Sequence, residues 1–147
     1  MNPLSELDEL LAGLAPGLEP EEYVFCTLPC TAAMPAALAP LATMREAEGL
    51  SLVLPAETPR DAGLACEGPF RLITLRVHSS LKAVGLTAAV AGALAAAGIS
   101  ANVVAGYHHD HLFVPADRAE DALAVLCNLS ETASGGSRGS PGNARGR

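Results

Sequence analysis

The sequence predicts an α+β fold made of two related ferredoxin-like units of βαββαβ type, each with an antiparallel sheet and helices packed on one face. Two observations support this prediction. Short strand-like apolar segments alternate with segments of helical spacing along most of the chain. The stretch LVLPAETPRDAGL from Leu52 also resembles the stretch LFVPADRAEDAL from Leu112, which indicates an internal repeat.

The composition is that of a folded domain with a core of small aliphatic side chains. Of the 147 residues, 50% are hydrophobic but only 3% are aromatic, and there is no tryptophan. The formal net charge of −7 disfavours binding to nucleic acid, which needs clustered Lys and Arg. Residues 133–147 contain three arginines and no acid, but they lack the interleaved aromatics of a nucleic-acid-binding segment.

We expect a cytoplasmic protein that does not associate with membranes. The N-terminus has no basic region followed by an apolar one, so it does not resemble a signal peptide. The most apolar stretch, residues 83–99, is too short for a bilayer span and is mostly Ala and Gly. In this compartment Cys26, Cys30, Cys66 and Cys127 are expected to be reduced, buried thiols.

The chain divides into four predicted regions. An N-terminal helix and linker occupy residues 1–21, a first unit 22–66, a second unit 67–132 and a tail 133–147. The tail consists largely of Gly, Ser and Arg and has no apolar anchor. It cannot bury enough apolar surface to offset the conformational entropy that ordering would cost, so we expect it to be disordered.

The elements expected up to residue 66 are a helix over 4–14, a strand over 23–28, one helical turn within 31–39, a hairpin of 41–46 with 50–54, and a short helix over about 57–64. Leucines at helical spacing predict the first helix, and Pro16 ends it. A β-rich run predicts the strand. Pro35 and Pro40 limit the next segment to a single turn.

The elements expected after residue 66 are a strand over 70–78, a helix over 81–97, a strand over 102–108, a turn at 109–110, a strand over 111–115 and a helix over 116–129. Residues of the first strand alternate between two faces. Leu86, Val90 and Leu94 form an apolar stripe on the first helix, and Gly98 is suited to end it. The order βαββα leaves each unit without a final strand, which pairing between the units or across a dimer would supply.

The second half of the chain resembles the ACT-domain family. The resemblance rests on the VGLTAA start of a helix, on the GIS turn into a strand, and on the HDHLFVP strand with its following helix. It is strongest over 67–129 and weaker over 22–64. The sequence looks most similar to small bacterial proteins with a pair of ACT units, distantly similar to CASTOR-type amino-acid sensors. The resemblance implies binding of a free amino acid or similar small ligand between units, and regulation of a partner.

The loop from the predicted strand into the predicted helix is the expected carboxylate site. Unpaired N–H groups and the positive end of the helix dipole favour an anion there, and Gly85 permits close backbone approach. The alternative is that Ser79 or Ser80 only caps the helix and Gly85 only serves packing. Asp110 is the expected partner of the ligand ammonium, and the alternative is that it only favours a tight turn. The expected ligand-binding residues are His78, Ser79, Ser80, Val84, Gly85, Leu86, Thr87, Tyr107, His108 and Asp110.

Other function classes stay open at this point. The cluster from His108 to His111 invites a metal site or catalysis, but it has no matching second set of ligands. The chain contains no G-x-S-x-G and no glycine-rich phosphate loop, so we expect no enzyme activity and no cofactor. A ridge of small residues over 83–95 would also suit a protein-interaction or dimerisation module without a ligand, including a homodimer.

Overall fold

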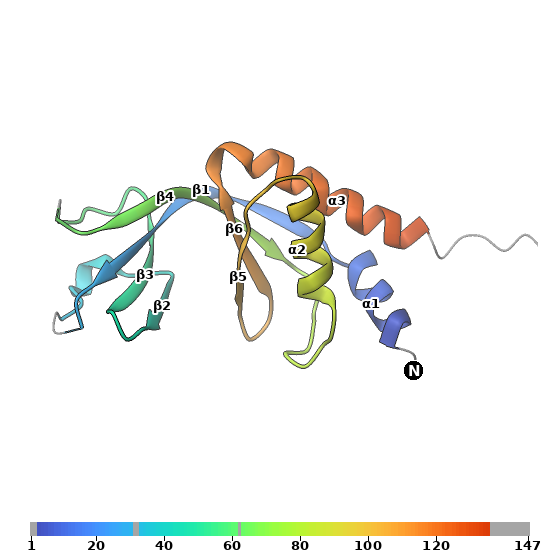
Figure 1. Cartoon of the computed structure of the whole chain (residues 1–147), viewed down its shortest axis with the longest axis horizontal. Helices are drawn as coiled ribbons and strands as arrows, with labels where there is room; N and C mark the ends of the chain where they lie inside the picture. The colour runs from blue at the N-terminus through green and yellow to red at the C-terminus, as the bar shows by residue number, and fades with distance from the viewer. Residues whose placement is uncertain (1–2, 31–32, 62, 136–147) are drawn as a thin grey trace, which may run out of the picture.

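The structure is a computed structural model that describes residues 3–30, 33–61 and 63–135 (Figure 1). Its elements are α1 (Pro3–Ala12), β1 (Pro16–Leu28), the 3₁₀ turn η1 (Ala36–Leu38), β2 (Ala42–Arg45), β3 (Leu50–Pro55), β4 (Cys66–Leu75), α2 (Leu86–Ala96), β5 (Asn102–Ala105), β6 (Asp110–Pro115), the 3₁₀ turn η2 (Ala116–Arg118) and α3 (Ala119–Gly135). The strands form one sheet in the order β2-β3-β1-β4-β6-β5, and every neighbouring pair is antiparallel. The predicted α+β class is confirmed.

The two central strands, β1 and β4, belong to both halves of the sheet. The part of β1 from Tyr23 to Leu28 pairs with β3, whereas residues 16–18 pair only with β4. The part of β4 from Phe70 to Leu75 pairs with β6, and its beginning pairs only with β1. The first half therefore has the order β2-β3-β1-β4 and the second half β1-β4-β6-β5. Each unit takes its missing fourth strand from the first strand of the other unit.

A proline-containing irregularity separates the two parts of β1. The pairing of β1 with β4 shifts register between Leu18 and Glu22, around Pro20, which has no N–H to donate to a ladder. The Arg71 guanidinium on β4 donates two hydrogen bonds to the freed carbonyl of Glu19, at 3.0 and 2.7 Å. The long strand therefore bends without leaving this carbonyl unpaired.

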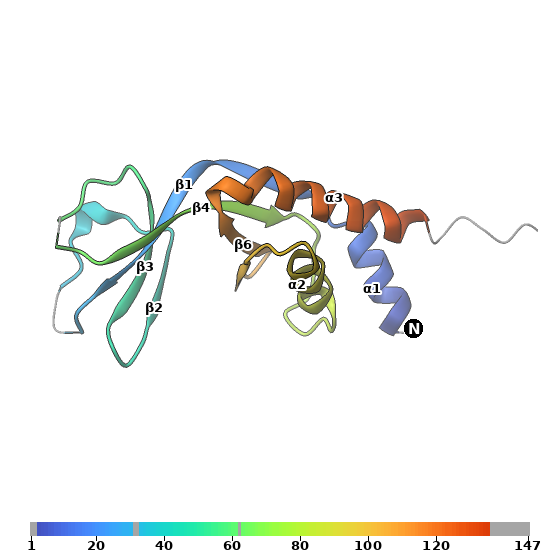
Figure 2. The same cartoon turned by 45° about the horizontal axis from the view of Figure 1, so that its top comes forward.

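The helices α1, α2 and α3 all lie over the second half of the sheet (Figure 1, Figure 2). The stripe of Leu86, Val90 and Leu94 is buried as the sequence predicts, against sheet residues such as Ile73 and Leu112. The hydroxyl of Ser130 on α3 donates to the carbonyl of Ala12 at the end of α1, at 3.0 Å. In the described ranges no helix is long and apolar enough to cross a membrane.

The first half of the sheet carries no α-helix among the described residues, and the short helix expected over about 57–64 is wrong. Two turns replace it: Thr58 donates to the Pro55 carbonyl, and Gly63 donates to the Asp61 carboxylate. Pro59 between these turns interrupts a helical hydrogen-bond ladder. The face of Val24, Cys26, Leu52 and Leu54 is instead covered by Leu38 of η1, together with Ala56 and Leu64.

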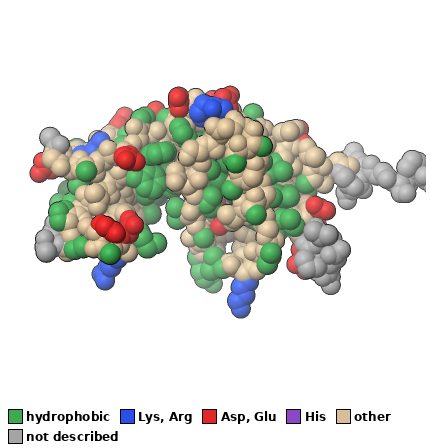
Figure 3. Space-filling model, in the orientation of Figure 1, with side chains coloured by type: hydrophobic (Ala, Val, Ile, Leu, Met, Phe, Trp, Pro, Cys, Tyr) green, Lys and Arg blue, Asp and Glu red, His purple; other side chains and the backbone are tan. Residues whose placement is uncertain are grey.

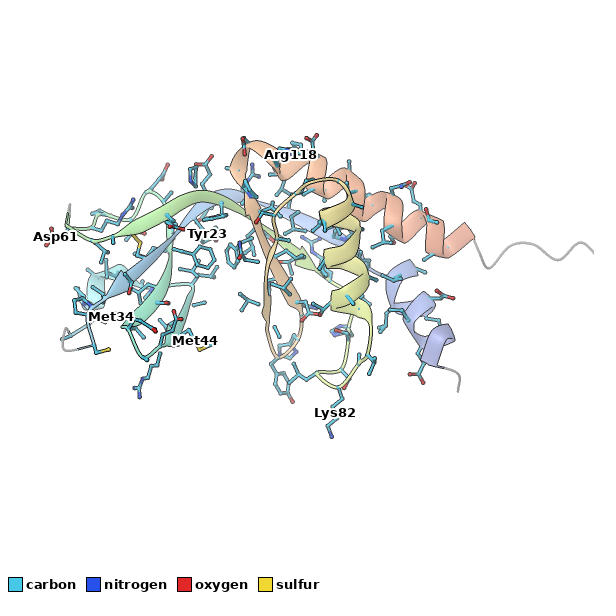
Figure 4. All side chains as sticks on the ribbon, viewed as in Figure 1. Tyr23, Met34, Met44, Asp61, Lys82 and Arg118 are labelled. Carbon is cyan, nitrogen blue, oxygen red and sulfur yellow. A yellow bond between two sulfur atoms is a disulfide. The ribbon has the colours of Figure 1, made fainter. Side chains whose placement is uncertain are left out.

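The opposite face of the sheet carries most of the aromatic side chains, and no helix of the described residues covers it. Tyr23, Phe25, Phe70 and Phe113 form successive edge-to-face contacts with ring centroids 5.1–5.8 Å apart. Tyr23 lies at the bend between the two halves in Figure 4. Hydrophobic side chains border the indentation below this bend in the space-filling view of Figure 3. Most of the aromatic residues of the chain therefore hold the two halves together.

Several predicted boundaries differ from the structure. The helix expected over 81–97 begins only at Leu86, because residues 80–83 form a turn and Gly85 adopts a φ of +101°. The strand expected over 102–108 ends at Ala105. The turn expected at 109–110 is instead a four-residue turn over 106–109, closed by a 2.9 Å hydrogen bond. The expected disordered tail, 133–147, overlaps α3 at its first three residues, and 136–147 lie outside the described residues.

The expectation of four reduced, buried thiols is wrong. Cys26 and Cys66 face each other on β1 and β4 with Cα atoms 4.1 Å apart, and a disulfide joins them. Cys30 and Cys127 are free but exposed. The sequence did not reveal the pair because the two cysteines are 40 residues apart and only the strand register brings them together. Cytoplasmic location stays a prediction.

Candidate ligand-binding site

The loop that leads from β4 into α2 meets the β5–β6 hairpin around one cavity of about 100 Å³. Loop, helix and hairpin all contribute to it. The lining residues are Ser79, Ser80, Leu81, Ala83, Leu86, Thr87, Ala105, Gly106, His109 and Asp110. The two places where the sequence predicts carboxylate and ammonium recognition therefore open into the same space.

The loop side of the cavity ends in the N-terminus of α2. Gly85 is the N-cap residue with φ +101°, and no side chain of the described residues caps this helix end. The first N–H groups of a helix have no intrahelical acceptor, and the helix dipole makes this end positive. Leu86 and Thr87, the first residues of α2, line the cavity. This wall is therefore suited to an anion.

Gly85 also has a packing role. A Cβ at this position would lie 3.1 Å from Cδ2 of Leu7 on α1, and its φ is one that L side chains rarely adopt. The Ser80 hydroxyl meanwhile accepts a 3.1 Å hydrogen bond from the Lys82 N–H and so organises the loop. Lys82 itself points away from the molecule at the tip of the loop (Figure 4).

The hairpin side of the cavity carries a carboxylate and an imidazole. Asp110 is half-buried, and no hydrogen bond or ion pair involves its carboxylate among the described residues. It is the first residue of β6 and so lies after the turn, outside it. Its presence is therefore not explained by turn formation.

His109 has an unsatisfied polar atom. Its Nδ1 is buried without a hydrogen-bond partner within the described ranges. The His78 ring lies beside it, with centroids 5.2 Å apart and planes tilted by 40°. Buried nitrogens without a partner are rare because each loses its hydration without compensation.

His111 supports the hairpin from the helix-free face of the sheet. Its Nδ1 lies 3.0 Å from Oγ1 of Thr74 on β4. Its Nε2 would lie 3.1 Å from a Cβ added at Gly106, so a side chain there would collide with the ring and with the His109 carbonyl. Burial lowers the pKa of His111 from its ordinary value of 6.5, and neighbouring His109 lowers it further.

The structure brings together half of the residues expected at the site. Of the ten, Ser79, Ser80, Leu86, Thr87 and Asp110 line the cavity. Outside this lining are His78, Val84, Gly85, Tyr107 and His108. Val84 and Tyr107 are 83% and 84% exposed, and the Tyr107 and His108 rings contact each other.

Sequence reasoning missed His109. It expected the turn at 109–110, whereas the turn spans 106–109, so His109 ends the turn and faces the cavity. Gly106 was the available signal, since a glycine before the histidines favours an earlier turn. The metal alternative gains no support: the described residues contain no cluster of three or more His, Cys, Asp or Glu side chains placed to hold a metal ion.

Comparison with known proteins agrees with this architecture. Two sequence models of the ACT domain match the chain in tandem, over residues 2–71 and 67–128. A crystal structure from Vibrio cholerae, described as a protein of unknown function and possible transport protein, is 49% identical. It covers 88% of this chain and 99% of its own, with a TM-score of 0.78. No curated protein matches the chain.

More distant structures share the fold. A protein from Agrobacterium tumefaciens is 19% identical with a TM-score of 0.69, over 78% of this chain and 87% of its own. Escherichia coli aspartokinase III, solved with aspartate and ADP, is 15% identical with a TM-score of 0.60; the match spans 78% of this chain and 33% of the enzyme. With two ACT models that together span nearly all the described residues, and with a 49% identical relative matched over 88% of the chain, the chain belongs to the ACT-domain family as a tandem-ACT protein.

Proposed function

We propose that the chain is a regulatory module that binds a free amino acid in the cavity between the β4–α2 loop and the β5–β6 hairpin. The observation that carries this proposal is that Asp110 and the N-terminus of α2 line one cavity. An amino acid presents a carboxylate and an ammonium group a few ångströms apart, and these two walls offer the matching partners.

The carboxylate would lie at the helix N-terminus. The N–H groups of Leu86 and Thr87 would donate to it, and the Ser79 hydroxyl would add a further donor. Hydrogen bonds of this kind to a charged group contribute about 1.5–3 kcal/mol each. The alternative that Ser79 or Ser80 only caps the helix is not supported, since neither side chain caps α2.

The ammonium group would lie against Asp110. The internal repeat shows that the hairpin itself does not need this carboxylate. Leu50 occupies the same place in the first hairpin, at the first residue of β3 and opposite the last residue of β2. Because an apolar residue serves equally well there, the Asp110 carboxylate is available for a ligand.

The proposed role is binding without turnover. Regulation would follow if the ligand-bound form presents a different surface to a partner protein.

Isothermal titration calorimetry with the twenty amino acids tests the proposal. We expect saturable binding of at least one of them, and Asp110→Asn should weaken it by about 10- to 100-fold, because a charge-assisted contact is lost. Glu57→Gln is the matched control, since it removes one negative charge from an exposed position elsewhere. The proposal is wrong if no amino acid binds, or if Asp110→Asn binds as tightly as the parent protein.

A further inference from the structure

A further cavity lies in the first unit, between the end of β1 and the β2–β3 hairpin. Its lining residues are Pro29, Cys30, Arg45, Glu46, Gly49 and Leu50. The proposed amino-acid cavity lies between the loop that follows β4 and the β5–β6 hairpin. Since β1 and β4 are the first strands of the two units, the two cavities occupy related places in the internal repeat.

The hairpin wall of each cavity comes from the same four positions of the repeat. In the first unit these positions are Arg45, Glu46, Gly49 and Leu50, and in the second unit Ala105, Gly106, His109 and Asp110. In both hairpins the first and last of the four pair across the two strands. A 2.9 Å backbone hydrogen bond joins the second and third in both turns. The two hairpins therefore present equivalent backbone positions to their cavities, and only the side chains differ.

The side chains give the two hairpin walls opposite charge. Leu50 takes the position of Asp110, so the first-unit cavity has no carboxylate there to hold an ammonium group. Arg45 takes the position of Ala105 and adds a positive charge to the lining. A guanidinium group can donate two parallel hydrogen bonds to one carboxylate. This hairpin is therefore suited to an anion, whereas the hairpin of the second unit is suited to a cation.

The other polar side chains of this lining already have partners. The Glu46 carboxylate accepts a hydrogen bond from the Ser51 hydroxyl. The Cys30 thiol donates to the Ala47 carbonyl, with Sγ and the oxygen 3.5 Å apart. Between the described residues no hydrogen bond or ion pair involves the Arg45 guanidinium. Arg45 is therefore the lining side chain whose donors are available to a ligand.

We propose that the first-unit cavity is a second ligand site, which binds a small carboxylate without an amino group. The inference rests on the proposed amino-acid site as its template and adds a second class of ligand. Arg45 would hold the carboxylate, and Leu50 would contact the apolar part of the ligand. An ammonium group would find no acceptor and would lie near a like charge, so the two sites of one chain would take different ligands.

The test compares propanoate with L-alanine, which is propanoate with an added amino group. Both are titrated into the full chain at constant ionic strength and followed by two-dimensional amide NMR. We expect propanoate to shift the backbone signals of Glu46, Gly49 and Leu50, with at least about tenfold higher affinity than L-alanine at these signals. The reason is that an unpaired charged group costs at least the equivalent of one hydrogen bond to a charged group.

Three variants assign the effect to the guanidinium. Arg45→Gln should weaken propanoate binding by about tenfold or more, because a charge-assisted contact is lost. Arg45→Lys keeps the charge and should lose less. Lys82→Gln is the matched control, because it removes one exposed positive charge that points away from the molecule in the other unit (Figure 4). It should bind propanoate as tightly as the parent protein does.

The inference is wrong if propanoate shifts none of the three signals, if L-alanine binds there as tightly, or if Arg45→Gln keeps the affinity of the parent protein. Asp110→Asn should leave propanoate binding unchanged, so its effect on amino-acid binding bears on the proposed function alone. The amide spectrum of each variant shows whether a lost affinity accompanies a lost fold.

Discussion

Thr74 and His111 face each other across β4 and β6, with Oγ1 of the threonine 3.0 Å from Nδ1 of the histidine. This contact holds the reverse side of the hairpin that carries Asp110 and His109. It involves a half-buried imidazole, so the hairpin that forms one wall of the proposed site also contains a group whose protonation is coupled to folding.

Acidification should destabilise the protein through His111. Burial, followed by the effect of His109, lowers the pKa of His111 below 6.5 in the folded state. Between that lowered pKa and 6.5 the unfolded chain binds more protons, so stability is present above pH 6.5 and is lost as the pH falls below it. Melting temperatures at pH 7.5 and 5.5 check this, and His111→Gln should lose less between them. Equal losses in both proteins would contradict the prediction.

The Cys26–Cys66 disulfide should stabilise the fold measurably. It closes a loop with a sequence separation of 40, and a link of this length contributes about 2–4 kcal/mol, mainly by restricting the unfolded chain. The double variant Cys26→Ala, Cys66→Ala should therefore show a lower free energy of unfolding by that amount in urea. Thiol titration of the unfolded, unreduced protein should find only Cys30 and Cys127. Four reactive thiols would show that the disulfide had not formed.

Gly85→Ala should destabilise the protein by about 1–2 kcal/mol, because an L side chain at φ +101° is strained and its Cβ would approach Leu7. Gly92→Ala is the natural comparison. It lies within α2 with nothing within 4 Å of an added Cβ, so it should be neutral or stabilise by about 0.5–1 kcal/mol. Urea denaturation of both variants measures the difference. A similar effect of both substitutions would mean that the backbone of Gly85 is not constrained as described.

The second unit should not fold without the first. Residues 16–18 of β1 pair with Leu75, Thr74 and Ile73 on β4, and Leu11 and Leu14 are buried in the same core as α2 and α3. A fragment of residues 67–147 lacks this strand and these leucines, so we expect it to show no cooperative unfolding by circular dichroism. Adding a fragment of residues 1–66 should restore the transition. A cooperative transition in the isolated fragment would contradict the shared-strand description.

Local sequence signals predicted most of the secondary structure. Strand alternation and helical leucine spacing located β1, β3, β4, β6, α1 and α3, because burial of one face imposes a period on the sequence. The helix predicted over about 57–64 was wrong for a local reason, since the Pro59 ring and the Asp61 turn outweigh the helical spacing around them. The start of α2 was displaced because the dihedral angle of Gly85 is not visible in the pattern.

The candidate site was predicted only in part for a related reason. The loop residues Ser79 and Ser80 and the acid Asp110 were identified from residue type and order, and the structure places all three around one cavity. His109 was missed because a shift of the turn by a few residues changes which side chain faces the cavity. The position of the turn depends on how β5 and β6 pair, and the types of the residues around the turn do not fix that pairing.

The sequence by itself determined the internal repeat, the α+β class and the buried stripe of α2. Each of these follows from the spacing of apolar side chains along the chain, because those side chains are buried away from water. Only the tertiary structure decided that β1 and β4 complete each other's sheets, that Cys26 meets Cys66, and that the N-terminus of α2 shares a cavity with Asp110. These relationships join residues far apart in the chain. The pairing of whole strands selects them, since backbone hydrogen bonds and the packing of both sheet faces must be satisfied at once.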